Sequence, residues 1–230
     1  MILEGVPILE QLILEETILR LYGQDWILIN YNSPAAIVMG SSSQLGEHVD
    51  LHVLTKSPVS LIQRFSGGGS VFIDENTFFL TYIFDKSSNS FCLYPNQIFQ
   101  WVFLSLRQVF TIPGFDIREN DFVIHDRKVG GNAQYIKKDR WLQHMSFLWD
   151  FVPENMTYLR IPSRQPKYRY RRAHLDFLTK LSFYYDCRKE YFIDTFITKL
   201  LSMYAINMVH VRDITSTLLK DPRSCLMDAF

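Results

Sequence analysis

Three consecutive glycines close behind an arginine are the first residues whose spacing suggests chemistry. Gly67, Gly68 and Gly69 follow Arg64 in a stretch otherwise rich in strand-forming residues. Glycine weakens a strand unless the backbone must turn tightly or approach another group. Consecutive bare N–H groups can bind an anion beside the fixed fork of an arginine. The pattern indicates either an anion site or a Gly/Ser hairpin turn. It is neither a Walker A nor a dinucleotide-binding motif, because no Gly-Lys-Ser/Thr follows and the next element is a strand.

A lysine precedes a second glycine cluster. Lys128 lies two residues before Gly130 and Gly131, inside another strand-like stretch. A surface lysine is the ordinary alternative. The glycine pair favours a functional lysine, because it removes side-chain bulk beside the ammonium, as a ligand requires.

The composition indicates a compact globular domain that could position these groups. The chain has 230 residues, of which 47% are hydrophobic and 21% charged, which excludes a disordered or collagen-like protein. The 24 Lys and Arg residues balance 24 Asp and Glu residues, so no overall field draws the chain to nucleic acid or to an anionic membrane. The N-terminal stretch has no signal-peptide pattern, and no apolar run reaches about eighteen residues. We expect a cytoplasmic protein without membrane association.

Three cysteines, Cys92, Cys187 and Cys225, are scattered without C-x-x-C spacing. Their number and spacing argue against a disulfide framework and against a structural zinc site. A reducing compartment fits this usage.

The hydrophobic pattern predicts a single domain of the α+β class over residues 1–230. Helices are predicted at residues 8–22, 94–110, 175–185 and 191–204. Strands are predicted at residues 26–29, 35–39, 59–65, 70–73 and 78–84, within 122–148, and at 208–211. Strands that cluster before and after one helix favour a mixed β-sheet flanked by helices over regular βαβ alternation.

Four motifs occur in an order that resembles one protein family. They are Arg64-Phe65-Ser66-Gly67-Gly68-Gly69-Ser70-Val71-Phe72, Arg118-Glu119-Asn120-Asp121, Asp126-Arg127-Lys128-Val129-Gly130-Gly131-Asn132-Ala133 and His144-Met145-Ser146-Phe147-Leu148. The series resembles the biotin/lipoate A/B protein ligase family, in its lipoate–protein ligase A branch. Residues 162–177 are similar to a stretch of the short, single-domain members, and the likeness runs from about residue 10 to residue 180.

The resemblance implies a fold and a reaction. The fold would be the catalytic domain of biotin and lipoate ligases, which is related to class II aminoacyl-tRNA synthetases. In the reaction, ATP and Mg²⁺ activate lipoate as lipoyl-adenylate. The lipoyl group then passes to a lysine of a lipoyl domain, in the E2 subunit of a 2-oxoacid dehydrogenase or in the glycine-cleavage H protein. Two-domain ligases of this family carry a C-terminal accessory domain that helps to form the adenylate, and 230 residues cannot hold both domains. The resemblance therefore leaves three alternatives: a separate accessory subunit completes the site, this branch works without the domain, or the chain only transfers the acyl group.

The resemblance also implies roles for residues. Lys128 would be the catalytic cation at the acyl carbonyl and the phosphate, where negative charge grows. The implied adenylate-binding residues are Arg64, Ser66, Gly67, Gly68, Gly69, Ser70, Val71, Asp74, Asn120, Asp121, Asp126, Gly130, Gly131, Asn132, Ala133, His144 and Ser146. Asp121 would bind Mg²⁺, which prefers carboxylate, water and phosphate oxygens. A polar turn at Asn120–Asp121 and a buried, satisfied His144 are the alternatives. The chain departs from many ligases in having Ile73-Asp74 where they have His-Asp.

Two other functions remain open at this point. An ATP-independent octanoyl or lipoyl transferase needs a reactive thiolate, but no cysteine lies in a Pro-Cys-Gly motif. An inactive relative or a nucleic-acid-binding module would use the basic stretch 160–172, which holds six basic residues and no acid. We favour a solvated loop that also contacts an acidic acceptor domain, and we do not expect nucleic acid as a partner. Residues 66–70 or 137–140 are candidate lids over a reactive adenylate.

Overall fold

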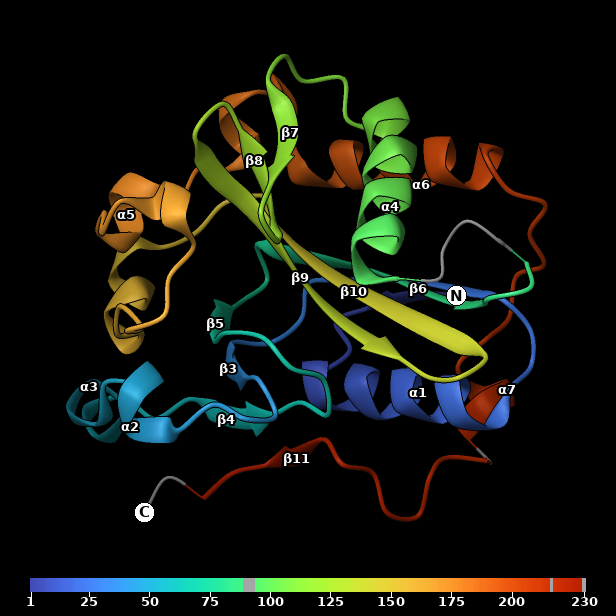
Figure 1. Cartoon of the computed structure of the whole chain (residues 1–230), viewed down its shortest axis with the longest axis horizontal. Coiled ribbons are helices and arrows are strands. Elements are labelled where there is room, and N and C mark those ends of the chain that lie inside the picture. The colour runs from blue at the N-terminus through green and yellow to red at the C-terminus, as the bar shows by residue number, and fades with distance from the viewer. Residues whose placement is uncertain (89–93, 216, 229–230) are drawn as a thin grey trace.

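The computed structural model describes residues 1–88, 94–215 and 217–228. Two sheets form its framework, a seven-stranded sheet in the order β1-β2-β6-β10-β9-β8-β7 and a four-stranded sheet in the order β11-β4-β3-β5 (Figure 1). The strands are β1 (Ile2–Glu4), β2 (Trp26–Tyr31), β3 (Ala36–Met39), β4 (Ser60–Gln63), β5 (Val71–Ile73), β6 (Thr77–Asp85), β7 (Phe115–Arg118), β8 (Asp121–Ile124), β9 (Arg127–Ile136), β10 (Arg140–Leu148) and β11 (Cys225–Leu226). The α-helices are α1 (Ile8–Leu21), α2 (Leu45–His48), α3 (Leu51–Lys56), α4 (Pro95–Val109), α5 (His174–Phe177), α6 (Lys189–Ser202) and α7 (Arg212–Thr215).

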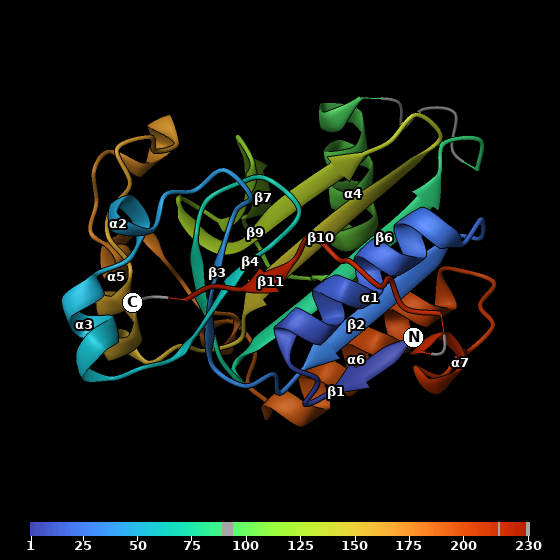
Figure 2. The same ribbon diagram turned by 90° about the horizontal axis from the view of Figure 1, so that it is seen from below.

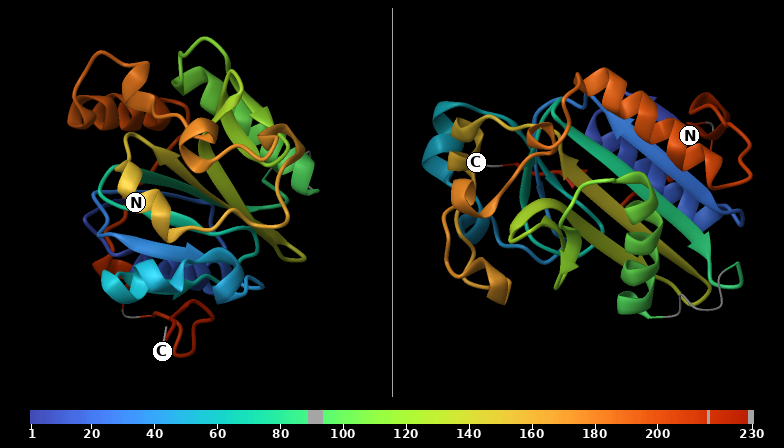
Figure 3. Two further views of the ribbon diagram at one scale, coloured as in Figure 1. Left: turned by 90° about the vertical axis from the view of Figure 1, so that its left-hand side faces the viewer. Right: turned by 90° about the horizontal axis from the view of Figure 1, so that it is seen from above.

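The large sheet is covered on both faces. Helix α1 lies along one face, and α4 and α6 lie on the opposite face (Figures 2 and 3). The alternation of side chains along the strands explains this arrangement. On β6, for example, Ile83 packs with the buried residues of α1, whereas Tyr82 packs with those of α4 and α6.

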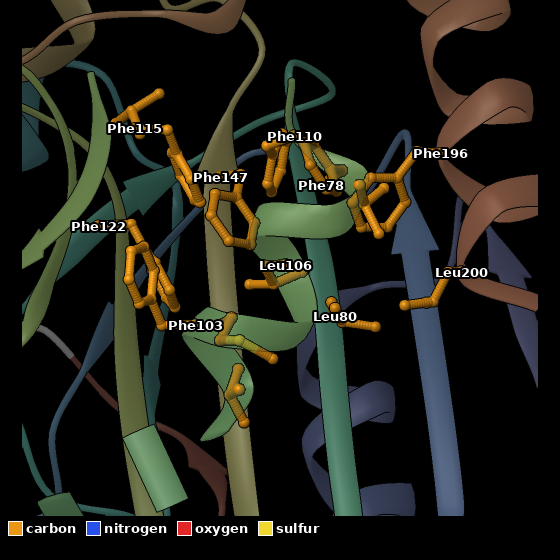
Figure 4. Close-up of a cluster of buried hydrophobic side chains, with 14 of the residues drawn as sticks. Phe78, Leu80, Phe103, Leu106, Phe110, Phe115, Phe122, Phe147, Phe196 and Leu200 are labelled. Atoms are coloured by element: carbon orange, nitrogen blue, oxygen red, sulfur yellow. The ribbon is translucent and has the colours of Figure 1, made fainter. Parts of the chain in front are cut away.

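The face under α4 and α6 holds an aromatic core (Figure 4). Phe78 of β6 lies at its centre, with ring centroids 5.2 Å from both Phe147 of β10 and Phe196 of α6. Such pairs stabilise a core beyond the area they bury. The packing fixes the strands β6 and β10, and β10 in turn carries β9 through an antiparallel ladder.

After β10 the chain forms a long irregular segment. It contains two 3₁₀ turns, Pro153–Tyr158 and Lys167–Arg169, then α5 and a third 3₁₀ turn, Leu181–Phe183. The segment returns to the large sheet, where Thr179 donates its backbone N–H to the Lys128 carbonyl at 2.8 Å. We call residues 156–178 the roof segment.

The last part of the chain runs back across α1 to the small sheet. We call residues 217–228 the strap. Within it, the backbone N–H of Leu219 donates to Thr17 Oγ1, and the backbone N–H of Arg223 donates to Glu16 Oε2. Further on, β11 pairs antiparallel with β4, with Cys225 opposite Gln63. The strap therefore covers α1 and borders the residues that precede Gly67.

Most predicted elements are present, and two predictions are wrong. The predicted mixed sheet and the helices at 8–22, 94–110 and 191–204 are confirmed as α1, α4 and α6. Residues 175–185 form only the short α5 and a 3₁₀ turn, because the backbone there bonds to Lys128 instead of continuing a helix. Residues 208–211 form no strand, and the last strand is β11. Among the described residues, none of the helices has the length and apolar character needed to cross a membrane.

Candidate active site

A cleft of about 670 Å³ lies between the small sheet, the end of the large sheet and the roof segment. One wall comes from residues that follow β3 and from the loop that leads into β5. The floor comes from β8, β9 and β10. The lining includes Ser42, Ser43, Glu47, His48, Gly68, Gly69, Ser70, Val71, Phe72, Ile73, Glu119, Asn120, Asp121, Lys128, Gly130, Gly131, Ser146, Arg160, Arg164, Gln165, Arg169, His174 and Phe177.

Lys128 and Asp121 form an ion pair at the floor of this cleft. Lys128 Nζ lies 2.6 Å from Asp121 Oδ1, and the lysine side chain is 23% exposed. The other carboxylate oxygen, Asp121 Oδ2, accepts a hydrogen bond from the Tyr168 hydroxyl at 2.8 Å. The ammonium is thus held in place by a partner that is itself anchored.

A β-bulge decides which way Lys128 points. Asp121 lies opposite Gly131 in the β8–β9 ladder, but the register shifts between Phe122 and Val123, so that Val123 lies opposite Lys128. Without the shift, the register would place Val129 opposite Val123. Because side chains alternate between the two faces of a sheet, Lys128 would then point to the face opposite that of Asp121. The bulge turns Lys128 toward Asp121, while Val129 is buried in the aromatic core.

Gly131 leaves room for the ammonium of Lys128. A Cβ atom at this position would lie 3.3 Å from Lys128 Nζ, which is tighter than ordinary contact. Gly131 lies opposite Ser146 of β10. The lysine therefore borders bare backbone, which a ligand can approach closely.

Arg64 supports the glycine loop, defined as residues 64–70, from inside. Its Nη2 donates to the carbonyls of Gly67 and Gly69, both at 2.9 Å, and Nε donates to Gly67 O at 3.2 Å. Arg64 is buried, and this burial lowers its pKa to about 10. Gly68 has a φ of +109°, and a Cβ there would lie 2.6 Å from Arg64 Nη2. The guanidinium holds the loop and does not line the cleft.

The roof segment is fastened to the β8–β9 hairpin by several polar contacts. Arg172 Nη1 pairs with Asp126 Oδ2 at 2.9 Å, and Arg127 Nη2 donates to Leu175 O at 2.7 Å. The Arg169 guanidinium lies over the Phe177 ring, 4.7 Å from its centroid. Part of the basic stretch 160–172 is therefore used inside the protein, in contrast to the predicted solvated loop.

His174 stands in the roof beside two cations. It lines the cleft, and its pKa is lowered by burial and by the positive charges of Arg169 and Lys128. Arg169 Nη2 lies 3.3 Å from His174 Nδ1, and His174 Nε2 lies 3.1 Å from Leu159 O. A neutral ring that accepts at Nδ1 and donates at Nε2 satisfies both contacts.

Ten of the eighteen predicted site residues line the cleft. They are Gly68, Gly69, Ser70, Val71, Asn120, Asp121, Lys128, Gly130, Gly131 and Ser146. The other eight do not line it: Arg64, Ser66, Gly67, Asp74, Asp126, Asn132, Ala133 and His144. The hairpin at residues 137–140 also lies outside the lining, which leaves the glycine loop as the nearer of the two candidate lids.

Besides Arg64, three of the eight residues outside the lining have clear structural roles. His144 Nδ1 lies 2.9 Å from Glu15 Oε1 in a buried polar cluster under α1. Asp74 accepts from the backbone of Asn76 in the β5–β6 turn, and burial raises its pKa. Asp126 binds Arg172. The structure thus favours the alternative weighed for His144, a buried histidine with a partner.

The residues around Asp121 do not form a protein cage for a metal ion. In the described parts of the chain, no group of three or more His, Cys, Asp or Glu side chains could hold a metal. Both Asp121 oxygens already accept from protein donors. A Mg²⁺ ion bound by Asp121 would share this carboxylate with Lys128 and Tyr168.

The sequence patterns missed most of the roof and part of the first wall. Neither Tyr168 nor His174 was assigned a role in the site, although both lie in the stretch that resembles the short ligases. Ser42, Ser43, Glu47 and His48 carry no local motif and reach the cleft only because β3 and β5 are paired. The basic character of residues 160–172 was the one signal that could have marked the roof.

The two sheets and their flanking helices define the catalytic-domain fold of lipoate protein ligases. A lipoate-protein ligase A solved with bound ATP superposes with a TM-score of 0.72 at 15% identity, over 93% of this chain and 91% of that one. A bipartite lipoate protein ligase of Thermoplasma acidophilum, studied together with its E2 lipoyl domain, gives a TM-score of 0.71 at 17% identity, over 93% of this chain and 90% of that one.

Residues 7–204 match the family model of the lipoyl protein ligase A/B catalytic domain. The chain belongs to this family. It is similar to inactive lipoate–protein ligase 2 of Plasmodium falciparum, with 25% identity over an alignment 272 positions long. This alignment covers 90% of this chain and 69% of that protein. It is 27% identical over 127 residues to the lipoate-protein ligase LplJ of Bacillus subtilis, over 55% of this chain. That match spans only 38% of the bacterial protein's length.

Proposed function

We propose that this chain activates lipoate with ATP as lipoyl-adenylate and transfers the lipoyl group to a lysine of a lipoyl domain. The observation that carries the proposal is the position of Lys128. Its ammonium lies at the floor of the cleft, beside the bare backbone of Gly131 and across from the glycine loop. A fixed cation next to accessible amides is what an acyl-adenylate requires.

The two steps make the same electrostatic demand at Lys128. In the first, a carboxylate oxygen of lipoate attacks the α-phosphorus of ATP, and pyrophosphate leaves. In the second, the neutral amine of the acceptor lysine attacks the acyl carbon, AMP leaves with the electrons of the broken C–O bond, and the amine loses a proton. Negative charge grows on oxygen in both steps, first on the phosphoryl group and then on the carbonyl, where Lys128 would stabilise it.

The cleft also offers an apolar region for the aliphatic tail of lipoate. The apolar lining residues are Phe72, Leu148, Met156, Leu159, Phe177 and Leu178. The roof segment covers this region and would shield the adenylate. Shielding matters because only about one acceptor lysine in 10³ is neutral at pH 7, so the intermediate must survive until one arrives.

Two comparisons bear on substrates and partners. The ATP-bound ligase and the bipartite ligase with its E2 lipoyl domain have the same fold as this chain, which supports ATP as the activating nucleotide and a lipoyl domain as the acceptor. Mg²⁺ would accompany the nucleotide. The bipartite ligase also supports a separate accessory subunit as a partner. The relative from Plasmodium falciparum that is named inactive makes the activity itself the first thing to measure.

The test measures pyrophosphate release with lipoate, ATP and Mg²⁺, and lipoyl transfer to a lipoyl domain by mass spectrometry. Lys128→Met should reduce both rates by about 10²- to 10³-fold, as does loss of one preorganised donor. Lys199→Met is the matched control, because Lys199 is an exposed lysine of α6. Absence of both reactions in the unaltered chain, with and without candidate accessory subunits, would contradict the proposal and indicate an inactive relative.

Among the described residues, no cysteine supports the alternative function, an ATP-independent acyl transferase that works through a thioester. Cys187 is packed against the aromatic core, Cys225 lies on β11, and neither lines the cleft. Cys92 lies outside the described residues. Pyrophosphate release that persists when all three cysteines are replaced by serine would exclude this route, whereas acyl transfer without ATP would favour it.

A further inference from the structure

Tyr168 connects the roof segment to the charged pair at the floor of the cleft. Its hydroxyl donates to Asp121 Oδ2 at 2.8 Å, while Lys128 Nζ lies 2.6 Å from Asp121 Oδ1. One carboxylate therefore joins a residue of the roof to the lysine on β9.

We propose that Tyr168 is a positioning residue that orients Asp121, and through it Lys128, within the cleft. The inference rests on the proposed function, in which Lys128 is the catalytic cation. A carboxylate with one free oxygen can rotate about its terminal bond. The hydroxyl occupies Oδ2 and leaves Oδ1 for the ammonium, so the ion pair has one preferred geometry.

The surroundings of Tyr168 make it a rigid anchor. The residue is 7% exposed, and its ring lies 5.2 Å from that of Phe177. Its backbone N–H donates to Glu119 Oε1 at 3.3 Å. Burial and the charge of Asp121 raise the pKa of Tyr168, so the hydroxyl keeps its proton and remains a donor at physiological pH.

The same segment also fixes the main chain of Lys128. Thr179, just beyond the roof segment, donates its N–H to Lys128 O, and Leu178 forms a parallel bridge with Lys128. The side chain and the backbone of the lysine are thus held by parts of the chain eleven residues apart, Tyr168 and Thr179. A change in the roof is transmitted to Lys128 through both contacts.

Tyr158 provides a closely matched control. It is also 7% exposed, its hydroxyl donates to Ser57 O at 2.8 Å, and its ring lies 5.2 Å from that of Phe72. Tyr158 does not line the cleft, and its hydroxyl bonds to a backbone carbonyl of α3's C-cap residue Ser57 and not to a carboxylate. Replacing either tyrosine by phenylalanine keeps the ring and removes one hydroxyl, so that a general loss of packing is excluded as the cause of a difference.

The first experiment measures how fast the full chain is acetylated at Lys128 by N-hydroxysuccinimidyl acetate, with peptide mass spectrometry as the readout. Tyr168→Phe should raise the labelling rate several-fold, because Asp121 no longer restrains the amine in one geometry. Tyr158→Phe should leave it unchanged. Asp121→Asn should raise the rate at least as much, and the double variant Tyr168→Phe/Asp121→Asn should add nothing, since both changes act through one carboxylate. An unchanged rate in Tyr168→Phe, or an additive double variant, would overturn the inference.

The second experiment measures the kinetics of lipoyl-adenylate formation. Tyr168→Phe should lower kcat about 10-fold, the fold-change of a lost hydrogen bond to a charged group, with a smaller change in KM, because the restraint acts on a group needed in the transition state. Tyr158→Phe should match the unaltered chain. If the unaltered chain forms no adenylate, the proposed function fails while the labelling result still decides the role of Tyr168. If it forms adenylate and Tyr168→Phe behaves like Tyr158→Phe in both experiments, only the inference fails.

Discussion

Lys128 and Gly131 face the same side of β9 although they are three positions apart along the strand. A Cβ at Gly131 would lie 3.3 Å from Lys128 Nζ. In a regular strand, residues three apart face opposite sides. The bulge opposite Phe122 and Val123 removes this alternation and creates the space in which we place the ligand.

The first prediction follows from that space. Gly131→Ala should leave the protein folded but reduce adenylate formation by roughly 10-fold, because the added methyl group pushes the ammonium from its position, and misplacement of about 1 Å can cost up to 10² in rate. Gly23→Ala, just after α1 and outside the cleft lining, is the control, since a Cβ there meets nothing within 4 Å and the backbone φ is not in the left-handed region. Steady-state rates and thermal unfolding of both variants provide the check. Equal rates in the two variants would show that the space beside Lys128 is not used.

The second prediction separates a structural from a ligand-binding role for Arg64. Arg64→Lys keeps the charge but loses the fork that holds Gly67 O and Gly69 O. We expect the free energy of unfolding to fall by about 1.5 to 3 kcal/mol for each charged hydrogen bond lost, measured by urea denaturation without any ligand. Nucleotide binding should weaken as well, because the glycine loop shifts. Normal stability with impaired binding would instead assign Arg64 to the ligand.

The third prediction concerns the pH dependence of stability. The pKa of His174 is lowered in the folded state by burial, Arg169 and Lys128, so the unfolded chain binds a proton at this residue more readily. His174 should therefore make the protein less stable as the pH falls below about 6.5, the ordinary histidine value. The loss of unfolding free energy between pH 7.5 and pH 5.5 should be smaller in His174→Gln than in the unaltered chain. Identical losses would show that His174 does not contribute.

The fourth prediction concerns the strap. Ser224 Oγ accepts a hydrogen bond from Phe65 N at 3.1 Å, within the glycine loop. Ser224→Ala leaves this buried N–H without its partner, which costs about 1 to 3 kcal/mol. We expect lower stability and faster proteolysis at residues 66–70. Ser202→Ala is a suitable control, because the Ser202 hydroxyl bonds only to Lys199 O within its own exposed helix end. Unchanged proteolysis in Ser224→Ala would show that the strap does not restrain the loop.

The sequence was sufficient to predict the elements that carry the site. The mixed sheet, helices α1, α4 and α6, and the two glycine clusters were all predicted from local patterns, because each depends on periodicity or on a residue type with a special backbone preference. The ordered motif series also indicated the family, which the family model then showed.

The contacts within the site could not be predicted in the same way. Arg64 is next to the glycines in sequence, but only the folded loop shows that its guanidinium bonds inward to carbonyls. His144 lies in a family motif, yet its partner Glu15 comes from α1, 129 residues away. The sequence around Tyr168 did not indicate its role, because that role depends on the Asp121 carboxylate on β8. The contacts of His144 and Tyr168 join distant segments, and no spacing rule covers such pairs.

The contact between Phe65 and Ser224 joins residues 159 positions apart. A ribosome makes the glycine loop early and the strap late, so during translation the loop emerges long before the serine that restrains it. Every nascent chain that has not yet reached residue 224 carries Phe65 without this partner. The final geometry of the glycine loop is therefore set only after residue 224 has been synthesised and has folded back onto Phe65.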